Sequence, residues 1–356
     1  MHLQQLGWDD SFAGNFKQIS VAGFVPARVI EQMKGFYRVS AEPGEYLADL
    51  AGRMRHLAAS PEDLPAVGDW VAIAVNSGSH RARIGAILPR RTQLARRAAG
   101  REVRAQIIAT NLDTVFIVTA ANQEFNLRRV ERYISAVWDG GAKPVILLNK
   151  ADLCRDAPVA PRELAAPLET AFPGVAVYAL SALEGRGLEA LWVSLAPAKT
   201  AAFVGSSGVG KSTIINALAN TSLATQPVRA KDDRGRHTTT SRQMIFLPNG
   251  GMVIDTPGMR EFQPWDAEEG THCAFEDIAE LAASCRFRDC CHRGEPGCAV
   301  ADAIQLGGLT RERLENHHKL MAELAFQDRK ADPRLAREQK QQWKKIHKAM
   351  RKSSKR

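Results

Sequence analysis

Residues 201–220 read AAFVGSSGVGKSTIINALAN and decide how the centre of this chain folds. An apolar stretch typical of a buried strand leads into a glycine-rich turn, and the turn leads into a stretch with helical spacing of apolar residues. Within it, GSSGVGKS at Gly205–Ser212 matches the pattern G-x-x-x-x-G-K-[ST] between a strand and a helix, the context that a phosphate-binding P-loop requires. The sequence therefore predicts a nucleotide site here.

The residue types in this loop suit phosphate chemistry. Glycines let backbone N–H groups surround the phosphates, and the helix N-terminus favours their negative charge. Lys211 is expected to reach the β- and γ-phosphates, acting also in catalysis, and the Ser212 hydroxyl to bind Mg²⁺. The nucleotide-binding residues expected here are Gly205, Ser206, Ser207, Gly208, Val209, Gly210, Lys211, Ser212 and Thr213.

A second motif, DTPG at Asp255–Gly258, closes another apolar stretch of strand length. Asp255 is expected to hold Mg²⁺ through water, and the Gly258 N–H to face the γ-phosphate. Common GTPases place a glutamine soon after this glycine to orient the attacking water, whereas here the next residue is Met259. Slow intrinsic hydrolysis is therefore expected unless another group completes the site.

Base specificity is carried by NKAD at Asn149–Asp152, after the strand-like PVILL. Guanine presents two adjacent N–H donors that one carboxylate, Asp152, can accept, and adenine lacks this pair. Asn149 is expected to support the loop, and the Lys150 stem to lie along the base. Ser181 and Ala182, after another predicted strand, suit a backbone contact to the guanine oxygen. The motifs together indicate GTP.

The order of these motifs indicates a circular permutation. In common GTPases the P-loop comes first and the base-specific loops last, whereas here residues 149–152 and 181–182 precede residues 205–212. The same parallel sheet can form if the old termini are joined and the chain is opened elsewhere. The new break falls just after DTPG, so we expect the C-terminal part to respond to the nucleotide state.

The group that completes catalysis is sought in RGRHTTT, Arg234–Thr240, between the P-loop and DTPG. His237 could orient the water, or Arg236 could neutralise charge, or the stretch could be a solvated loop. One threonine hydroxyl would complete the Mg²⁺ shell, and Thr239 is the position we favour.

Four of the six cysteines crowd into CRFRDCCHRGEPGC. Three thiolates and one imidazole suit tetrahedral Zn²⁺ and leave no open position, which predicts one structural zinc ion. A register that uses Cys291 in place of Cys290, or free thiols without metal, are the alternatives. The ligand set expected from C-x4-C-x-H-x5-C is Cys285, Cys290, His292 and Cys298.

Composition and charge narrow the class of protein. The 356 residues, 45% of them hydrophobic, are enough for two or three folded domains. No apolar run approaches the roughly 18 residues of a membrane span, and MHLQQLGWDD is no secretory signal, so we expect a cytoplasmic protein.

The net charge of +9 is located in residues 328–356, with 12 Lys/Arg against 3 Asp/Glu. Arg81–Arg104 is a second basic block, with eight arginines, and both suit nucleic acid or an anionic surface.

The pattern along the chain predicts a multidomain protein. Short strands with regular glycines indicate an antiparallel β-barrel, apolar strands alternating with helices an α/β P-loop domain, and the C-terminal part is mostly helical. Thr310 is expected to cap a long helix that Asp332-Pro333 ends. The expected domains are a loosely held arm at 1–18, the RNA-binding barrel at 19–104, the GTPase domain at 105–265, the zinc domain at 266–332 and a basic tail at 333–356.

The motifs together resemble the RsgA, or YjeQ, family of ribosome small-subunit-dependent GTPases, over roughly Val21–Leu306. The matching strings are GFYRVS, AVGDWVAI, LPRRTQLARRAAG, FNLRRVERY, NKADLC, GSSGVGKST, RGRHTTT, DTPGMREF and CRFRDCCHRGEPGCAV. The resemblance implies an OB-fold barrel, a circularly permuted GTPase domain and a zinc domain. It also implies binding to the small ribosomal subunit and its rRNA, a role late in subunit maturation, and GTP hydrolysis to GDP that the subunit stimulates.

Within this resemblance the family's catalytic histidine falls on His237, and its zinc ligands on the four residues named above. Two other readings stay open. The chain could be an RNA-binding scaffold that uses GTP only as a structural or sensing ligand, or a membrane-surface GTPase that uses its basic tail. Neither membrane binding nor an oligomer is expected.

Overall fold

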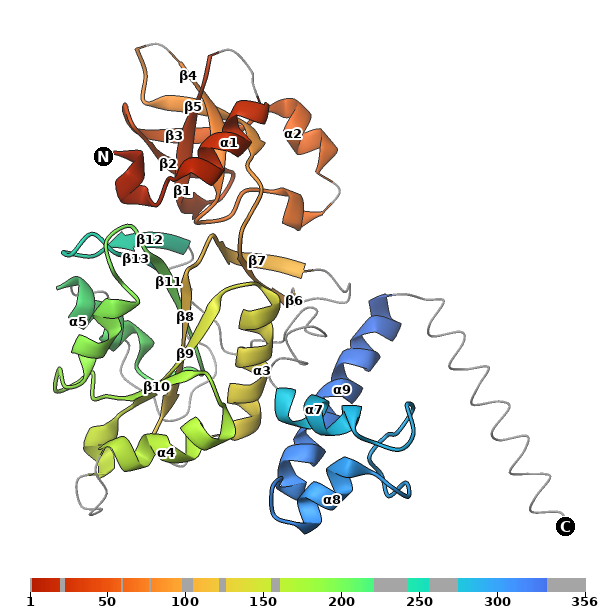
Figure 1. The fold of residues 1–356 in the computed structure, drawn as a ribbon. Helices are drawn as coiled ribbons and strands as arrows, with labels where there is room; N and C mark the ends of the chain where they lie inside the picture. Colours follow the sequence, from red (N-terminus) through yellow and green to blue (C-terminus); the bar gives the residue numbers. More distant parts are fainter. Residues whose placement is uncertain are drawn as a thin grey trace, which may run out of the picture. The chain divides into compact units, whose positions relative to one another are not determined.

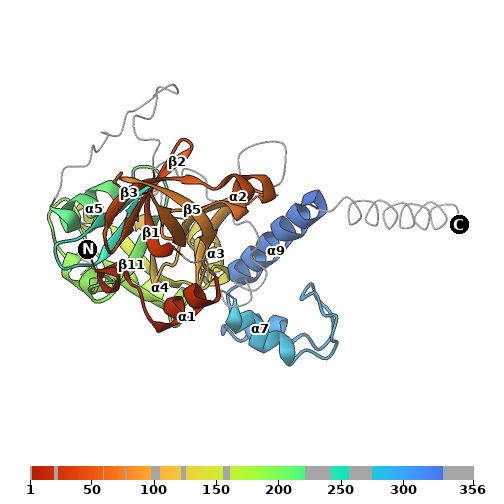
Figure 2. The same cartoon turned by 90° about the horizontal axis from the view of Figure 1, so that it is seen from above.

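The computed structural model describes residues 2–19, 23–58, 60–76, 78–97, 105–121, 126–154, 161–220, 242–255 and 275–331. The chain divides into two compact units, one of residues 1–97 with 104–265 and the other of residues 98–103 with 266–356 (Figures 1 and 2). The predicted nucleotide motifs belong to the first unit and the Cys/His motif to the second.

A five-stranded barrel forms the N-terminal part of the first unit, as expected from the regular spacing of glycines. Its strands pair in the order β1-β2-β3-β5-β4, and β1 also pairs with β4, which closes the barrel. This is the pattern of a small OB-type barrel. Val29, Val39, Ile73 and Ile84 are fully buried inside it. The elements are β1 (Phe24–Met33), β2 (Phe36–Ala41), β3 (Gly44–Leu50), α2 (Gly52–Leu57), η2 (Pro61–Asp63), β4 (Trp70–Val75) and β5 (Arg81–Ile87).

The N-terminal segment is not the loosely held arm that the sequence suggested. It forms η1 (Leu3–Leu6) and α1 (Asp10–Ile19), and α1 lies against the barrel in Figure 1. Leu6 is fully buried, Phe12 is 2% exposed, and the ring centroids of Trp8 and Trp70 are 4.7 Å apart. The prediction was wrong because the burial of these widely spaced apolar side chains, which holds the segment, depends on the barrel surface.

The α/β part of the first unit is a mostly parallel sheet, as predicted. Its strands run in the order β10-β9-β8-β11-β13-β12, with only β12 antiparallel to its neighbour β13. All seven residues of β8 are buried, as continuous apolar strands between helices require. The strands are β8 (Thr114–Ala120), β9 (Lys143–Asn149), β10 (Ala176–Ala179), β11 (Thr200–Val204), β12 (Arg242–Phe246) and β13 (Met252–Asp255).

Helices and one hairpin complete this part. The helices are α3 (Leu127–Asp139), η3 (Ala151–Cys154), α4 (Pro161–Ala171), η4 (Leu188–Val193) and α5 (Lys211–Ala219). A separate two-stranded sheet joins β6 (Gln93–Arg97) to β7 (Ala105–Thr110) between the barrel and β8.

The barrel and the GTPase sheet are one continuous hydrogen-bonded structure. Strand β1 pairs antiparallel with β12, with Glu31 opposite Gln243 and Gln32 opposite Arg242. The resulting sheet has 11 strands. Strand β12 follows directly after residues 221–241, which include the predicted switch stretch, so the barrel is joined to the strand that leads out of that stretch.

The basic block at Arg81–Arg104 is partly structural, which the sequence did not show. Arg90 donates to both carboxylate oxygens of Asp69, at 2.9 and 2.8 Å, and to the carbonyls of Glu62 and Leu64. Arg91 is paired with Asp9. Only part of the block is therefore available as a basic surface: Arg81 and Arg83 on β5 are exposed, and the Arg83 Nε lies 3.6 Å from Asp49 Oδ1.

The second unit is helical where it is described. It contains α7 (Glu276–Ala283), α8 (Ala299–Gln305) and α9 (Arg311–Ala331), and its buried side chains include Phe275, Ile278 and Val300. Thr310 Oγ1 accepts the Arg313 N–H at 3.2 Å, which confirms Thr310 as the predicted cap of the long helix. Asp332-Pro333 and the basic tail lie outside the described residues.

Candidate functional site

The P-loop lies where the sequence predicted it, between β11 and α5 (Figure 1). At two positions of the loop only glycine fits, because neighbouring atoms lie where a side chain would begin. A Cβ at Gly205, where φ is +143°, would lie 2.2 Å from the Val118 carbonyl oxygen. One at Gly210, where φ is +97°, would lie 2.2 Å from Asn149 Nδ2. Ser207, Gly208 and Ser212 are exposed, so this face of the loop is open to a phosphate ligand.

Lys211 begins α5 and bends back across the loop. Its Nζ donates to the carbonyls of Gly205, at 2.8 Å, and Ser206, at 2.7 Å. Burial lowers the pKa of Lys211 to about 8, while the negative charge of Asp255 acts in the opposite direction. Both of these hydrogen-bond acceptors are uncharged carbonyls. A phosphate would add a negatively charged acceptor for the buried ammonium group.

Asp255 ends β13, the strand next to β11. The register places Ala202 beside Ile254, so Asp255 follows beside Phe203, close to the start of the P-loop. The hydroxyl of Ser212 and the carboxylate of Asp255 are oxygen donors of the kind that Mg²⁺ binds together with nucleotide phosphates. Ser212 follows the P-loop at the start of α5, and Asp255 ends the neighbouring strand β13, so their joint role at Mg²⁺ stays a prediction.

Asn149 ties the base-specific loop to the P-loop. It is 2% exposed at the end of β9, where its Nδ2 donates to the Val209 carbonyl at 2.8 Å. Its Oδ1 accepts the Ala182 N–H at 3.0 Å. One buried side-chain amide therefore connects the three loops that follow β9, β10 and β11. The sequence predicted a nucleotide contact for each of these loops separately.

Asp152 is held in place by the loop that follows β10. Ser181, which is 1% exposed, donates its hydroxyl to Asp152 Oδ1 at 2.5 Å. Lys150 has a φ of +63°, so the chain turns sharply between β9 and Asp152. The sequence predicted only a backbone contact for Ser181, and the structure adds that its side chain orients the carboxylate that would read the base.

Arg129 is a residue near the site that sequence reasoning missed. It lies in the first turn of α3, which Asn126 caps by accepting the Arg129 N–H at 3.1 Å. Its guanidinium donates to the hydroxyl of Ser206 in the P-loop. The string FNLRRVERY follows a predicted strand and so places Arg129 at the start of a helix near the strand ends. Nothing in that string shows which neighbouring loop the arginine contacts.

Four positions predicted from the sequence lie outside the described residues: His237, Thr239, Gly258 and the alternative Arg236. Their roles stay predictions from the sequence.

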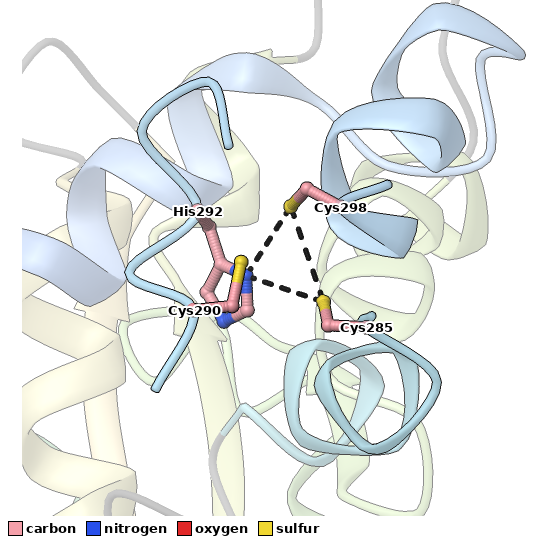
Figure 3. A group of neighbouring side chains, drawn as sticks. All are labelled: Cys285, Cys290, His292 and Cys298. Atoms are coloured by element: carbon pink, nitrogen blue, oxygen red, sulfur yellow. Dashed lines mark hydrogen bonds between the residues drawn. The ribbon is translucent and has the colours of Figure 1, made fainter. Parts of the chain in front are cut away.

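The Cys/His motif forms one cluster in the second unit. The ligand atoms of Cys285, Cys290, His292 and Cys298 all lie within 4.8 Å of one another. Cys285 Sγ is 4.0 Å from Cys298 Sγ and 3.7 Å from His292 Nδ1, which is 3.4 Å from Cys298 Sγ. Figure 3 shows these side chains converging from separate turns of the chain.

The spacing of the cluster fits a tetrahedral metal ion. Zinc–sulfur bonds of about 2.3 Å and zinc–nitrogen bonds of about 2.0 Å give S···S near 3.8 Å and S···N near 3.5 Å. Cys291 is exposed, and its Sγ donates to the Asp289 carbonyl at 3.6 Å, so the cluster contains Cys290 in its place. Cys298 also accepts the Ala301 N–H at 3.4 Å, which places its sulfur at the start of α8.

Membrane spans were also sought in the part of the chain that the structure describes. None of its helices is both long enough and apolar enough to cross a bilayer.

Comparison with known proteins agrees with this geometry. The family model described as RsgA GTPase matches residues 87–265. The chain is 45% identical to the small ribosomal subunit biogenesis GTPase RsgA of Opitutus terrae, across 99% of this chain and 97% of that protein. It is 43% identical to the protein of the same name from Methanosarcina acetivorans, across 96% and 90%.

Two solved structures are similar to the whole arrangement. YjeQ from Thermotoga maritima has a TM-score of 0.63 at 26% identity, covering 85% of this chain and 98% of that one. YloQ, described as a circularly permuted GTPase, has a TM-score of 0.61 at 26% identity, covering 85% and 96%. The chain is therefore similar to a solved protein that is described as circularly permuted.

Proposed function

This chain belongs to the RsgA GTPase family, and we propose that it hydrolyses GTP to GDP and phosphate on the small ribosomal subunit, late in the maturation of that subunit. It is a GTP hydrolase with a circularly permuted fold. The printed name of its relatives, small ribosomal subunit biogenesis GTPase, supports the choice of partner.

The observation that carries the proposal is the connection made by Asn149. Its two hydrogen bonds hold the base-specific loop, the loop after β10 and the P-loop together. A single bound nucleotide can then place its guanine against Asp152 and its phosphates against Lys211. A site of this kind is needed for GTP binding in either reading, and the name GTPase that the relatives carry favours hydrolysis over an RNA-binding scaffold that uses GTP only as a structural or sensing ligand.

The division of chemical work follows from the site. Lys211 and the P-loop amides bind the phosphates and stabilise the charge that develops as the γ-phosphate leaves. Ser212, Thr239 and Asp255 hold Mg²⁺, which supplies charge neutralisation when bound. His237 orients the attacking water, the task that Met259 cannot perform. Because His237 lies in the stretch that precedes β12, binding of a partner to the barrel acts on that stretch through the β1–β12 pairing.

The metal of the Cys/His cluster is zinc in this proposal, and its role is structural. Four protein ligands fill a tetrahedral shell and leave no position for a substrate. Metal analysis of the purified chain should find one zinc ion per chain, and substitution of Cys290 by Ser should remove it, whereas Cys291→Ser should retain it. Zinc retained by Cys290→Ser would contradict the ligand set.

The remaining assignments complete the proposal. The protein acts as a monomer in the cytoplasm without membrane contact, and it binds rRNA through the barrel at 19–104, with the exposed arginines of β5, and through the basic tail at 333–356. The GTPase domain spans 105–265 and the zinc domain 266–332.

The test is GTP hydrolysis with and without purified small ribosomal subunits, with large subunits and ATP as controls. Strong stimulation by small subunits alone is expected, and His237→Ala should lose it while still binding GDP. Hydrolysis that does not respond to small subunits would contradict the proposal and leave a GTP-binding RNA protein.

The role of the barrel is tested by surface substitution. Removal of residues 1–104 would also remove β1, which pairs with β12, and so would disturb the GTPase sheet. Arg81→Glu combined with Arg83→Glu changes exposed side chains and breaks only the surface ion pair of Arg83 with Asp49, so it should weaken subunit binding while GDP affinity stays unchanged. Unchanged subunit binding would exclude this face of the barrel.

A further inference from the structure

Arg129 lies where helix α3 meets the P-loop, and no step of the proposed GTPase cycle uses it. The meeting follows from the topology, because β8 and β11 are parallel neighbours whose carboxyl ends lie at the same edge of the sheet. Helix α3 follows β8, and the P-loop follows β11 (Figure 1). The Arg129 guanidinium donates to the hydroxyl of Ser206, the second residue of the loop.

The backbone of Arg129 is fixed, while its side chain is exposed. Helix α3 packs on β8 and β9, with Val130 at 2% and Ile134 at 0% exposure. The Asn126 side chain accepts the Arg129 N–H at 3.1 Å and holds the first turn. The Arg129 side chain itself is exposed, and Ser207 and Gly208, which follow Ser206, are exposed as well. A bound nucleotide can therefore approach this arginine without displacing any part of the core.

The positive charge of Arg129 is not neutralised by the part of the protein that the structure describes. No carboxylate there lies within ion-pair distance of its guanidinium, and its partner Ser206 is an uncharged hydroxyl. The first turn of α3 contains Arg128 and Arg129 and no acidic residue. Because the N-terminus is the positive end of a helix dipole, cations in this turn reduce the stability of the helix. The local structure of α3 therefore gives no reason for an arginine here.

Ser206 connects Arg129 to the phosphate-binding lysine. Lys211 Nζ donates to the Ser206 carbonyl at 2.7 Å, and Arg129 donates to the hydroxyl of the same residue. The lysine of a P-loop reaches the β- and γ-phosphates when a nucleotide is bound. Arg129 thus adds a second positive charge close to the end of the site where the γ-phosphate is expected.

We propose that Arg129 is a positioning residue of the GTPase site, which orients the P-loop through Ser206 and favours GTP over GDP by its charge. The preference arises because GTP has one phosphate more than GDP and hence more negative charge near the arginine. This inference rests on the proposed function in one respect, the assignment of the P-loop as the phosphate site.

The first test measures the affinity of the full chain for GDP and for a non-hydrolysable GTP analogue by fluorescence titration. Arg129→Met removes the charge and the hydrogen-bond donor. It should lower affinity for the GTP analogue about tenfold and for GDP only about threefold. Arg129→Lys keeps the charge without the planar donor group and should restore most of the preference for the GTP analogue. High salt should reduce the difference between wild type and Arg129→Met, because it screens exposed charges.

Arg128→Met is the matched control. It removes the same charge from the same turn of α3, and Arg128 has no hydrogen bond to the P-loop among the described residues. It should change either affinity by less than about twofold. Both variants should keep or raise the melting temperature, because each removes a cation from the positive end of the helix. A purely structural role of Arg129 would instead lower the melting temperature.

A double-mutant cycle tests the route through Ser206. Ser206→Ala removes the acceptor and leaves the charge of Arg129, so it should lose only part of the affinity for the GTP analogue. Addition of Ser206→Ala to Arg129→Met should cause no further loss, because the two residues act through one contact. Losses that simply add would contradict the positioning role.

Three further results would overturn the proposal. They are equal losses in Arg129→Met and Arg128→Met, an unchanged ratio of GTP-analogue to GDP affinity in Arg129→Met, or a lowered melting temperature that accompanies the loss. Lys211→Ala distinguishes this failure from failure of the proposed site, since it should abolish binding of both nucleotides. Retained binding in Lys211→Ala would contradict the P-loop assignment and the role of Arg129 together.

Discussion

The nucleotide site and the Cys/His cluster differ in how much apolar burial supports them. Of the strands that carry the nucleotide loops, β11 is buried at every residue and β9 at every residue but Lys143, and the strand between them, β8, is buried throughout. In the stretch 285–298 that carries the cluster, only Cys298 is buried. The first site is therefore held by a hydrophobic core that exists without its ligand, whereas the second depends on bonds to a metal.

Metal removal should give the largest effect, because it acts on the region with little core. Binding of structural zinc is worth about 10–16 kcal/mol in small metal-dependent domains, which exceeds what the few buried residues of the second unit can supply. After chelation, or in Cys285→Ser, hydrogen exchange in α7, α8 and α9 should become fast, while β8 and β11 stay protected.

Cys291→Ser is the control for this comparison, since Cys291 is exposed and lies outside the cluster. It should exchange like the wild type. Protection of α8 after chelation would show that the second unit folds without metal and would remove the contrast between the two regions.

The second effect in size concerns the base. Asp152→Asn replaces a charged acceptor by a neutral amide, and hydrogen bonds to charged groups are worth about 1.5–3 kcal/mol each. GDP affinity should fall roughly 100-fold, and XDP, whose base offers a carbonyl to the new amide, should bind better than to the wild type. Ser181→Ala keeps the carboxylate but loses its orienting bond, so its GDP affinity should fall only about fivefold. Isothermal titration calorimetry checks both, and unchanged GDP affinity in Asp152→Asn would contradict the assignment of the base.

The third prediction separates the core from the site within the first unit. Asn149→Ala removes two buried hydrogen bonds and should lower the free energy of unfolding by about 2–4 kcal/mol, with GDP binding weakened as well. Asn249 is the matched control: it donates to the Leu195 carbonyl at 2.7 Å and accepts the Gly251 N–H at 3.1 Å, at the hairpin between β12 and β13.

Asn249→Ala should therefore lose stability, by less because it is more exposed, and keep its GDP affinity. Urea unfolding and GDP titration measure the two quantities. If both variants weakened GDP binding equally, the connection through Asn149 would be a matter of general stability rather than of the site.

The same contrast explains what the sequence could predict. The strands β8, β9 and β11 were found because fully buried parallel strands are continuous apolar runs. Lys211, Asn149 and Asp152 could be named as candidates because phosphate and guanine restrict the residues that can bind them. The cap at Thr310 was found because capping is local in sequence.

Contacts between distant segments could not be predicted. The pairing of Glu31 with Gln243 and the burial of Arg28 against Leu6 and Asn111 depend on a register that no local pattern records. The same holds for Arg129, whose partner Ser206 lies 77 residues away. Arg90 was read as surface charge because its partner Asp69 became visible only in the folded barrel.

The last prediction tests a charge that burial perturbs at the nucleotide site, that of Lys211. Burial lowers the pKa of Lys211 to about 8 in the nucleotide-free chain, and bound phosphates must raise it because they favour the ammonium form. Binding near pH 8 therefore takes up a proton, so nucleotide affinity is full below pH 8 and is lost as the pH rises through that value. Between pH 7 and pH 9 GDP affinity should fall roughly tenfold, since only about one Lys211 in ten stays protonated at pH 9. Calorimetry in two buffers of different ionisation enthalpy should detect the proton uptake at pH 8.5, whereas Asp152→Asn should show the same pH profile at lower affinity. A flat profile would mean that Lys211 is fully charged before the nucleotide arrives, and that the hydrophobic core behind the P-loop has no effect on its protonation.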